Sequence, residues 1–402
     1  MKKFITKENI LKLILVLSSV NILNWFYKKY VIGEREVFWD LAVNYCAGKI
    51  YSLGNSPYGL LANNPIANCT KEAINLNEAF AYNYTIPLVK FFSLFNSLEF
   101  IDLKKIWLIT VIACTFCIYK NTKEVFAKKT DYLFYLALLL FSFGGIFFQS
   151  LLTGNISILG FAIISYAIVL IEKNNLKKFS FFILLASLIK PHFFFFIIIG
   201  LIYKGKKFFK IFLTTCFFLI FIYLTDYFLN KNIFFDFINT MKAMKEDLWF
   251  SSFGGGLGIM SINEQIPSRI FSLFNIYIPS GPSAFSNLFW FFLSSIFIIC
   301  IFFLFGLKKE CTFSKKNIFL AFCIISITIC LPRIAFYELY LAIPTLIYIS
   351  REFFYSSNKK ISNYGFILLI LILGIHDINM FFLINSILAF SLLIFNFKKI
   401  KY

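Results

Sequence analysis

Apolar runs of membrane length, separated by short lysine-rich linkers, dominate the chain from residue 9 to residue 396. The hydrocarbon core of a bilayer takes roughly 20 helical residues to cross, so the runs predict about twelve transmembrane or part-spanning helices. They are expected at 9–27, 102–120, 131–148, 155–172, 179–189, 192–203, 208–229, 285–307, 317–331, 334–350, 361–376 and 379–396. The pattern predicts an all-α polytopic membrane protein with a single integral membrane domain, 1–402.

The distribution of charge predicts which linkers face the cytoplasm, because Lys and Arg are enriched on that side. Lysine-rich linkers at 120–129, 173–178, 204–210, 308–316, 351–360 and 398–401 are expected inside, and the first run is expected to be an uncleaved anchor. Two longer, charge-balanced segments, 33–100 and 230–284, are expected to be external loops. Within the first loop, apolar spacing predicts a helix at Trp39–Tyr51 and an interfacial helix at Ile86–Leu98.

The run from Phe179 to Tyr203 conflicts with this topology, because both of its flanks are lysine-rich. Pro191 lies at its middle, where proline removes a backbone donor and disfavours helix just before it. We therefore predict two short helices that form a hairpin, with Lys190 and His192 at a tip on the external side. The alternative is one kinked span.

Composition restricts the class of protein. The chain is 59% hydrophobic and 21% aromatic, more apolar surface than a soluble core can bury. Its formal charge of +19 could indicate nucleic-acid binding, but the lysines lie in the linkers between spans. We therefore expect membrane lipids, and no nucleic acid, as partners.

The nine cysteines are scattered. Cys114 and Cys117 form a CxxC pair inside an apolar run, with no second pair or histidine nearby, so we expect small helix residues rather than a metal site. Cys46 and Cys69 lie in the first external loop, where an oxidising environment would permit a disulfide. The sequence does not decide between a disulfide and two free thiols.

Polar and ionisable residues at the boundaries of apolar runs usually face a cavity and carry function. Under the predicted topology many of them meet on the external side and favour a polar reaction chamber that opens outward. Each also has a structural explanation: Asp40 can pair with Arg35, Asn155 can cap a helix, and Lys190 can extend to the membrane surface. The set comprises Asp40, Gln149, Asn155, Lys190, His192, Arg333, Tyr337, Glu338, His376 and Asp377.

Several short motifs resemble a known family in order and spacing along essentially the whole chain. In the first loop they are Phe38-Trp39-Asp40 with Tyr45, Asn55-Ser56-Pro57-Tyr58, and Tyr82-Asn83-Tyr84-Thr85-Ile86-Pro87; later come Thr153-Gly154-Asn155, Lys190-Pro191, and Pro332-Arg333 with Tyr337-Glu338. Together they resemble glycosyltransferase family 87 (GT87), bacterial membrane enzymes of the GT-C class. These enzymes use polyprenyl-phosphate sugars, typically mannose.

The resemblance implies an inverting hexosyltransferase in the bacterial inner membrane, with its active site facing the periplasm. Asp40 matches the catalytic carboxylate and would be the general base for a hydroxyl of a lipid or glycan acceptor. Lys190, His192 and Arg333 would stabilise the phosphate of the polyprenyl-phosphate donor. The expected substrate-binding residues are Tyr45, Tyr84, Gln149, Asn155, Tyr337, Glu338 and His376. Glu338 departs from the family pattern, which has Asp or His at that position, so His376 could supply the imidazole.

No cofactor is expected, and no metal, because no second carboxylate accompanies Asp40 in a DxD-like pair. We expect the enzyme to act as a monomer. The alternative is a transporter or flippase, in which a broken helix would form a substrate site at the middle of the membrane. Inverted repeats and two discontinuous helices in corresponding halves would favour transport, and the sequence predicts one break and no repeat. A structural scaffold without chemistry is a third reading, disfavoured by the one-sided clustering of ionisable groups.

Overall fold

The computed structural model describes residues 6–30, 32, 37–59, 64–75, 82–128, 131–246, 313–331 and 336–374, with scattered positions between 274 and 299. All regular elements within these ranges are helices, as the apolar periodicity predicts, and no strand occurs among them. The chain forms two compact units, each built from separate stretches of sequence. One comprises residues 1–28, 122–148 and 254–402; the other comprises 29–121 and 149–253. The single-domain assignment stays a prediction.

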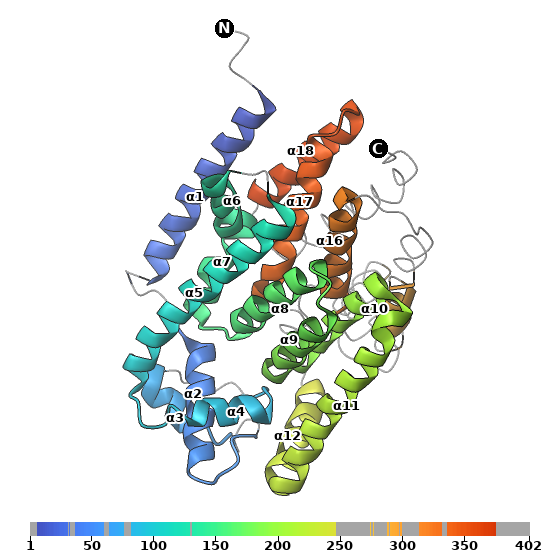
Figure 1. Cartoon of the computed structure of the whole chain (residues 1–402). Helices are drawn as coiled ribbons and strands as arrows, with labels where there is room; N and C mark the ends of the chain where they lie inside the picture. Colours follow the sequence, from blue (N-terminus) through green and yellow to red (C-terminus); the bar gives the residue numbers. More distant parts are fainter. Residues whose placement is uncertain are drawn as a thin grey trace. The chain divides into compact units, whose positions relative to one another are not determined.

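The unit of residues 29–121 and 149–253 contains the first predicted external loop and the predicted hairpin (Figure 1). Its helices are α2 (Trp39–Ser52), α3 (Ala67–Ile74), α4 (Ile86–Ser93), most of α5 (Phe100–Phe126), α8 (Ser157–Glu172), α9 (Leu176–Ile189), the 3₁₀-helix η3 (Pro191–Ile197), α10 (Ile198–Lys204), α11 (Lys206–Leu229) and α12 (Lys231–Glu246).

The other unit contains the chain's first helix and its later helices. Its elements are α1 (Lys7–Tyr30), α6 (Tyr132–Phe141), the 3₁₀-helix η2 (Ser142–Gly144), the start of α7 (Ile146–Thr153), α16 (Phe313–Cys330), the 3₁₀-helix η4 (Phe336–Leu341), α17 (Ala342–Phe354) and α18 (Lys359–Gly374). Asp131 caps α6 by accepting a hydrogen bond from the backbone N–H of Phe134 at 2.9 Å.

Two of the described helices, α1 and α11, are long and apolar enough to cross a membrane. A third span results if the bent pair formed by α6–η2 and α7 counts as one. These helices indicate a membrane protein, but the expected count of about twelve spans is not confirmed. The expected spans at 285–307 and 379–396 fall wholly or largely outside the described residues, as does most of the second external loop.

The span expected at 131–148 is not one straight helix. The helix is interrupted at 142–145, and its two parts are bent by 70°. Gly144 and Gly145 both have positive φ, and the buried Phe143 also lies in the left-handed region. Glycine adopts positive φ without steric cost, so this pair lets the chain leave the helix.

The break predicted at Lys190 is confirmed. Helix α9 ends at Ile189, Lys190 is extended, and Pro191 begins η3. Phe208, at the start of α11, contacts both ends of the interrupted segment. Its ring centroid lies 5.7 Å from that of Phe179 near the start of α9, and its ring packs against Gly200 in α10. The chain therefore returns toward its starting level after the break, as expected of a hairpin.

The first loop folds as helices linked by a disulfide. Helix α2 spans nearly the predicted range, whereas α4 ends at Ser93 instead of reaching Leu98. A disulfide joins Cys46 of α2 to Cys69 of α3, which answers the question that the sequence left open. Gly48 lets α2 approach α4 closely, because a Cβ there would lie 2.5 Å from the backbone carbon of Phe92.

Candidate functional site

The carboxylate of Asp40 is half-buried in the first turn of α2 and receives a hydrogen bond from Asn155. Asn155 Nδ2 lies 2.6 Å from Asp40 Oδ2. The amide is oriented by its other end, because Asn155 Oδ1 accepts from the backbone N–H of Ser157 at 2.9 Å. Asn155 is buried, so Asp40 is held by a fixed donor rather than by a mobile surface group.

Backbone geometry sets this position. Phe38, just before α2, is buried with φ 65°, a conformation that is unusual for a bulky residue. Its N–H donates to the carbonyl of Leu152 at 2.6 Å, which attaches the start of α2 to the end of α7. Gly154 has φ +70°, and a Cβ there would lie 2.7 Å from Leu41 Cβ. The turn that carries Asn155 is therefore packed directly against the helix that carries Asp40.

Asn44 lies one turn after Asp40 and was not among the predicted site residues. Its Nδ2 donates to the backbone carbonyl of Asp40 at 2.7 Å. Its side chain is fully buried, and its Oδ1 has no hydrogen-bond partner among the described residues. The sequence offers one signal for Asn44, which is a polar side chain directly after three apolar residues of a helix. A polar side chain that is buried at such a position requires a hydrogen-bond partner.

Lys190 occupies the helix break beside the first loop. Its Nζ lies 5.3 Å from the ring centroid of Tyr84, within the range of a cation–π contact. The hydroxyl of Thr85, the next residue, donates to the carbonyl of Leu188 in the last turn of α9. The first loop therefore contacts both the last turn of α9 and Lys190 at the break.

The break also lies near the start of α8, the helix that follows Asn155. The ring of Phe193 in η3 is 5.0 Å from that of Phe161, and it covers Gly160. His192 is half-buried, with its ring edge-on to Phe193 at 4.9 Å. Asp40, Asn155, Lys190 and His192 therefore belong to segments that pack around the same end of α8.

Lys104 of α5 adds a cation that the sequence analysis did not select. Its Nζ lies 5.7 Å from the ring centroid of Phe38 and 4.8 Å from that of Phe100. A lysine near the start of an apolar helix is usually explained by its reach to the membrane surface, so its position gave no distinct signal. In the structure it lies beside the residue that begins the Asp40 helix.

The other predicted site residues have different surroundings. Tyr45 is buried, and its hydroxyl donates to the carbonyl of Leu98 at 2.9 Å, so it packs the loop. Tyr84 is also buried, and Gln149 is half-buried in α7. Their roles in substrate binding stay predictions. Tyr337 and Glu338 lie in η4, where only the backbone is described, whereas Arg333, His376 and Asp377 lie outside the described residues.

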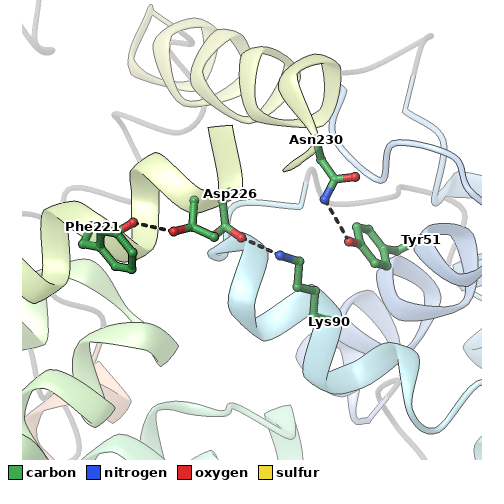
Figure 2. Close-up of polar contacts among 6 residues, drawn as sticks. Tyr51, Lys90, Phe221, Asp226 and Asn230 are labelled. Atoms are coloured by element: carbon green, nitrogen blue, oxygen red, sulfur yellow. Dashed lines mark hydrogen bonds and ion pairs between the residues drawn. The ribbon is translucent and has the colours of Figure 1, made fainter. Parts of the chain in front are cut away.

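A second polar cluster joins the first loop to the end of α11 (Figure 2). Lys90 Nζ of α4 lies 2.5 Å from Asp226 Oδ1, and Asp226 is almost completely buried. Asn230 Nδ2 lies 3.5 Å from the hydroxyl oxygen of Tyr51 at the end of α2. These residues are far apart in sequence, and no local pattern predicted that they would meet.

Buried tyrosines extend from this cluster. The rings of Tyr58 and Tyr82 are 5.4 Å apart, and those of Tyr82 and Tyr84 are 5.6 Å apart. Burial raises the pKa of Tyr82 well above its usual value, with the neighbouring Tyr84 adding to the effect. Burial also raises the pKa of Tyr58, and Tyr82 and Asp226 add to it. These hydroxyls therefore stay protonated at neutral pH.

Within the part of the chain that the structure describes, no group of three or more His, Cys, Asp or Glu side chains is arranged to hold a metal ion. Comparisons of the chain with protein-family models, curated proteins and solved structures found no match.

Proposed function

We propose that the protein is a membrane glycosyltransferase that moves a hexose, most simply mannose, from a polyprenyl-phosphate donor to a hydroxyl of a lipid or glycan acceptor. The observation that carries the proposal is the Asp40–Asn155 hydrogen bond of 2.6 Å. It holds a half-buried carboxylate at the start of a helix in the first loop. The sugar chemistry is proposed from the resemblance of the surrounding motifs to GT87.

In this mechanism Asp40 accepts the proton of the acceptor hydroxyl as that oxygen attacks the anomeric carbon. The bond from the anomeric carbon to the phosphate oxygen breaks, and the configuration inverts. The hydrogen bond from Asn155 orients the Asp40 carboxylate before the acceptor arrives. Asn155 acts through Asp40 and is a positioning residue.

The departing polyprenyl phosphate gains negative charge, which a nearby cation must stabilise. Among the residues that the structure describes, Lys190 is the candidate cation, because the helix break and the Tyr84 ring hold its side chain beside the first loop. His192 and Arg333 complete the proposed phosphate site.

The test uses purified protein in lipid vesicles with radiolabelled polyprenyl-phosphate mannose and a membrane-glycolipid extract as acceptor. Asp40→Asn should lower transfer by about 10²-fold or more, the scale expected for loss of a general base. Asp102→Asn is the matched control, because Asp102 is a half-exposed carboxylate that pairs with Lys105 at 2.7 Å on the helix surface. Transfer that survives Asp40→Asn would remove Asp40 as the base.

Transport of a lipid-linked or small polar substrate is the second candidate. The transport hypothesis is supported by the helix interruption at 142–145, which is a second broken helix in addition to the one at Lys190. Transporters often build substrate sites from discontinuous helices. Both breaks lie in the first half of the chain, however, whereas an inverted repeat places them in corresponding halves. Movement of a labelled polyprenyl-phosphate sugar across the vesicle membrane, without transfer to any acceptor, would favour transport.

A further inference from the structure

Helix α12 has one face whose side chains are exposed, with Tyr227 of α11 beside its first turns. Lys231, Phe235, Ile238 and Lys242 are spaced by four, three and four residues, so they share one side of the helix. All four are exposed, Phe235 at 46% and Ile238 at 44%. Lys231 Nζ lies 6.0 Å from the ring centroid of Phe235. The face thus has an apolar centre with a lysine toward each end.

The opposite side of α12 is docked on the protein. Phe237 and Thr240 are buried, and the Phe237 ring meets the Tyr58 ring edge-on at 5.3 Å. Tyr58 belongs to the first loop, and its hydroxyl donates to the carbonyl of Tyr84 at 3.0 Å. The helix is therefore fixed in orientation, with its lysine-flanked face directed away from the loop.

The position of α12 follows from the span that precedes it. Helix α11 is one of the two membrane-length helices, and its side chains Phe221 and Phe228 are 56% and 77% exposed. It ends at Leu229, and α12 begins at Lys231. The Lys90–Asp226 ion pair and the Asn230–Tyr51 contact lie at this end of α11 (Figure 2). Polar and charged groups gather at the end of a span where it leaves the hydrocarbon layer.

The chain changes direction at this junction. The ring centroid of Tyr227, near the end of α11, lies 5.5 Å from that of Phe234 and 5.8 Å from that of Phe235 in α12. Asn230, with φ −142° and ψ 61°, interrupts the helical path between them. α12 is therefore a separate helix and not a straight continuation of α11.

We propose that α12 lies in the membrane interface and binds the lipid surface through Lys231, Phe235, Ile238 and Lys242. Phe235 and Ile238 would contact the upper acyl chains, and the two lysines would reach anionic headgroups, as in amphipathic interfacial helices. Lipid is the occupant because this face begins one residue after a lipid-length helix whose own apolar side is exposed. The same helix holds the first loop through Phe237, so lipid binding supports the loop that carries Asp40.

The test is photo-crosslinking in the full-length protein, reconstituted into vesicles of equal parts phosphatidylethanolamine and phosphatidylglycerol. Phe235 or Ile238 is replaced by p-benzoylphenylalanine. Under near-ultraviolet light the excited ketone takes a hydrogen atom from a nearby C–H group, and the two carbon radicals join into one new C–C bond. Mass spectrometry then identifies the adduct as lipid or protein.

Two positions calibrate the result. Phe217 of α11, 64% exposed, is the positive control for contact with acyl chains. Asp236 is a half-exposed α12 residue that is not spaced three or four residues from any member of the lysine-flanked face, and it is the matched control. Positions 235 and 238 should form lipid adducts at a yield comparable to that at position 217 and severalfold above that at position 236.

Lipid adducts at positions 235 and 238 in yields no higher than at position 236 would overturn the proposal. Adducts of these two positions with protein instead of lipid would also overturn it and assign the face to a polypeptide partner. Only variants that retain the Cys46–Cys69 disulfide on non-reducing gels are compared, which excludes effects of misfolding. The outcome does not depend on the catalytic proposal, because no sugar transfer is measured.

Discussion

Two helices of this protein are interrupted, one at Gly144–Gly145 and the other at Lys190–Pro191, and they are interrupted for different reasons. At the first, two glycines and Phe143 adopt positive φ, and the helix axis bends by 70°. At the second, proline ends α9, and Thr85, Tyr84 and Phe161 pack against the break and the 3₁₀-helix that follows it. One break therefore depends on backbone freedom, and the other depends on the residues that pack around it.

Substitution of Gly145 should have the largest effect. Gly145→Ala places a side chain at φ +76°, which costs about 1–2 kcal/mol, and puts a Cβ 2.6 Å from Ile22 Cγ2. With the added clash we expect a loss of about 3 kcal/mol in the free energy of unfolding, measured by denaturant titration in detergent micelles. Gly54→Ala is the matched control, because Gly54 has φ +81° but open space around it, and should cost only about 1 kcal/mol. Equal losses in the two variants would show that the close packing at Gly145 has no energetic role.

The second break should be sensitive to packing instead. Gly160→Ala forces a Cβ into the ring of Phe193, with Cδ2 only 2.6 Å away, and should cost about 2 kcal/mol in the same titration. Phe193→Leu in the same chain should recover part of this loss, because it removes the ring that clashes. Strictly additive losses in the double variant would contradict the explanation.

Replacement of Pro191 should lower the free energy of unfolding less than changes to the residues that pack against the break. Pro191→Ala should lower the free energy of unfolding by only about 0.5–1 kcal/mol, mainly through greater freedom of the unfolded chain. The break itself should persist, since Thr85 and Phe161 still hold the segments on either side. A loss as large as that of Gly145→Ala would mean that proline alone maintains the break.

The smallest effect is expected for Tyr82, whose ring lies beside that of Tyr84 near the second break, and it should be seen only at alkaline pH. The folded pKa of Tyr82 is raised, so its contribution to stability is complete below the unfolded value of about 10 and is lost as pH rises beyond it. Tyr82→Phe should therefore change little at neutral pH and reduce the loss of stability above pH ~10. Gly145→Ala should leave that alkaline slope unchanged. The measurement is thermal unfolding across a pH series, and an identical alkaline slope in Tyr82→Phe and the wild type would refute the assignment.

Local patterns predicted the local features of the fold. Pro191 predicted the break, and apolar spacing predicted α2. Asn155 was a candidate because it lies at the boundary of an apolar run, and in the structure it donates a hydrogen bond to Asp40. These features depend on a few neighbouring residues. The break at Gly144–Gly145 was missed because glycine permits a departure from helix without requiring one.

Contacts between distant segments could not be predicted in the same way. Lys90 and Asp226 are 136 residues apart, and each alone resembles an ordinary charge near a helix end. Lys104 and Asn44 become candidates only through the folded packing, which places Lys104 beside Phe38 and Asn44 beside Asp40. Arg333 and His376 lie outside the described residues, so that part of the proposed site stays a prediction.

The disulfide between Cys46 and Cys69 has a consequence for how the protein is made. The two cysteines are 23 residues apart, and their thiols join only after both have reached an oxidant. The helix that bears Asp40 is therefore crosslinked to α3 only after this segment has emerged and met oxidising conditions. A host that keeps thiols reduced would produce a chain whose first loop lacks this crosslink, so the choice of expression strain governs whether purified material matches the native protein.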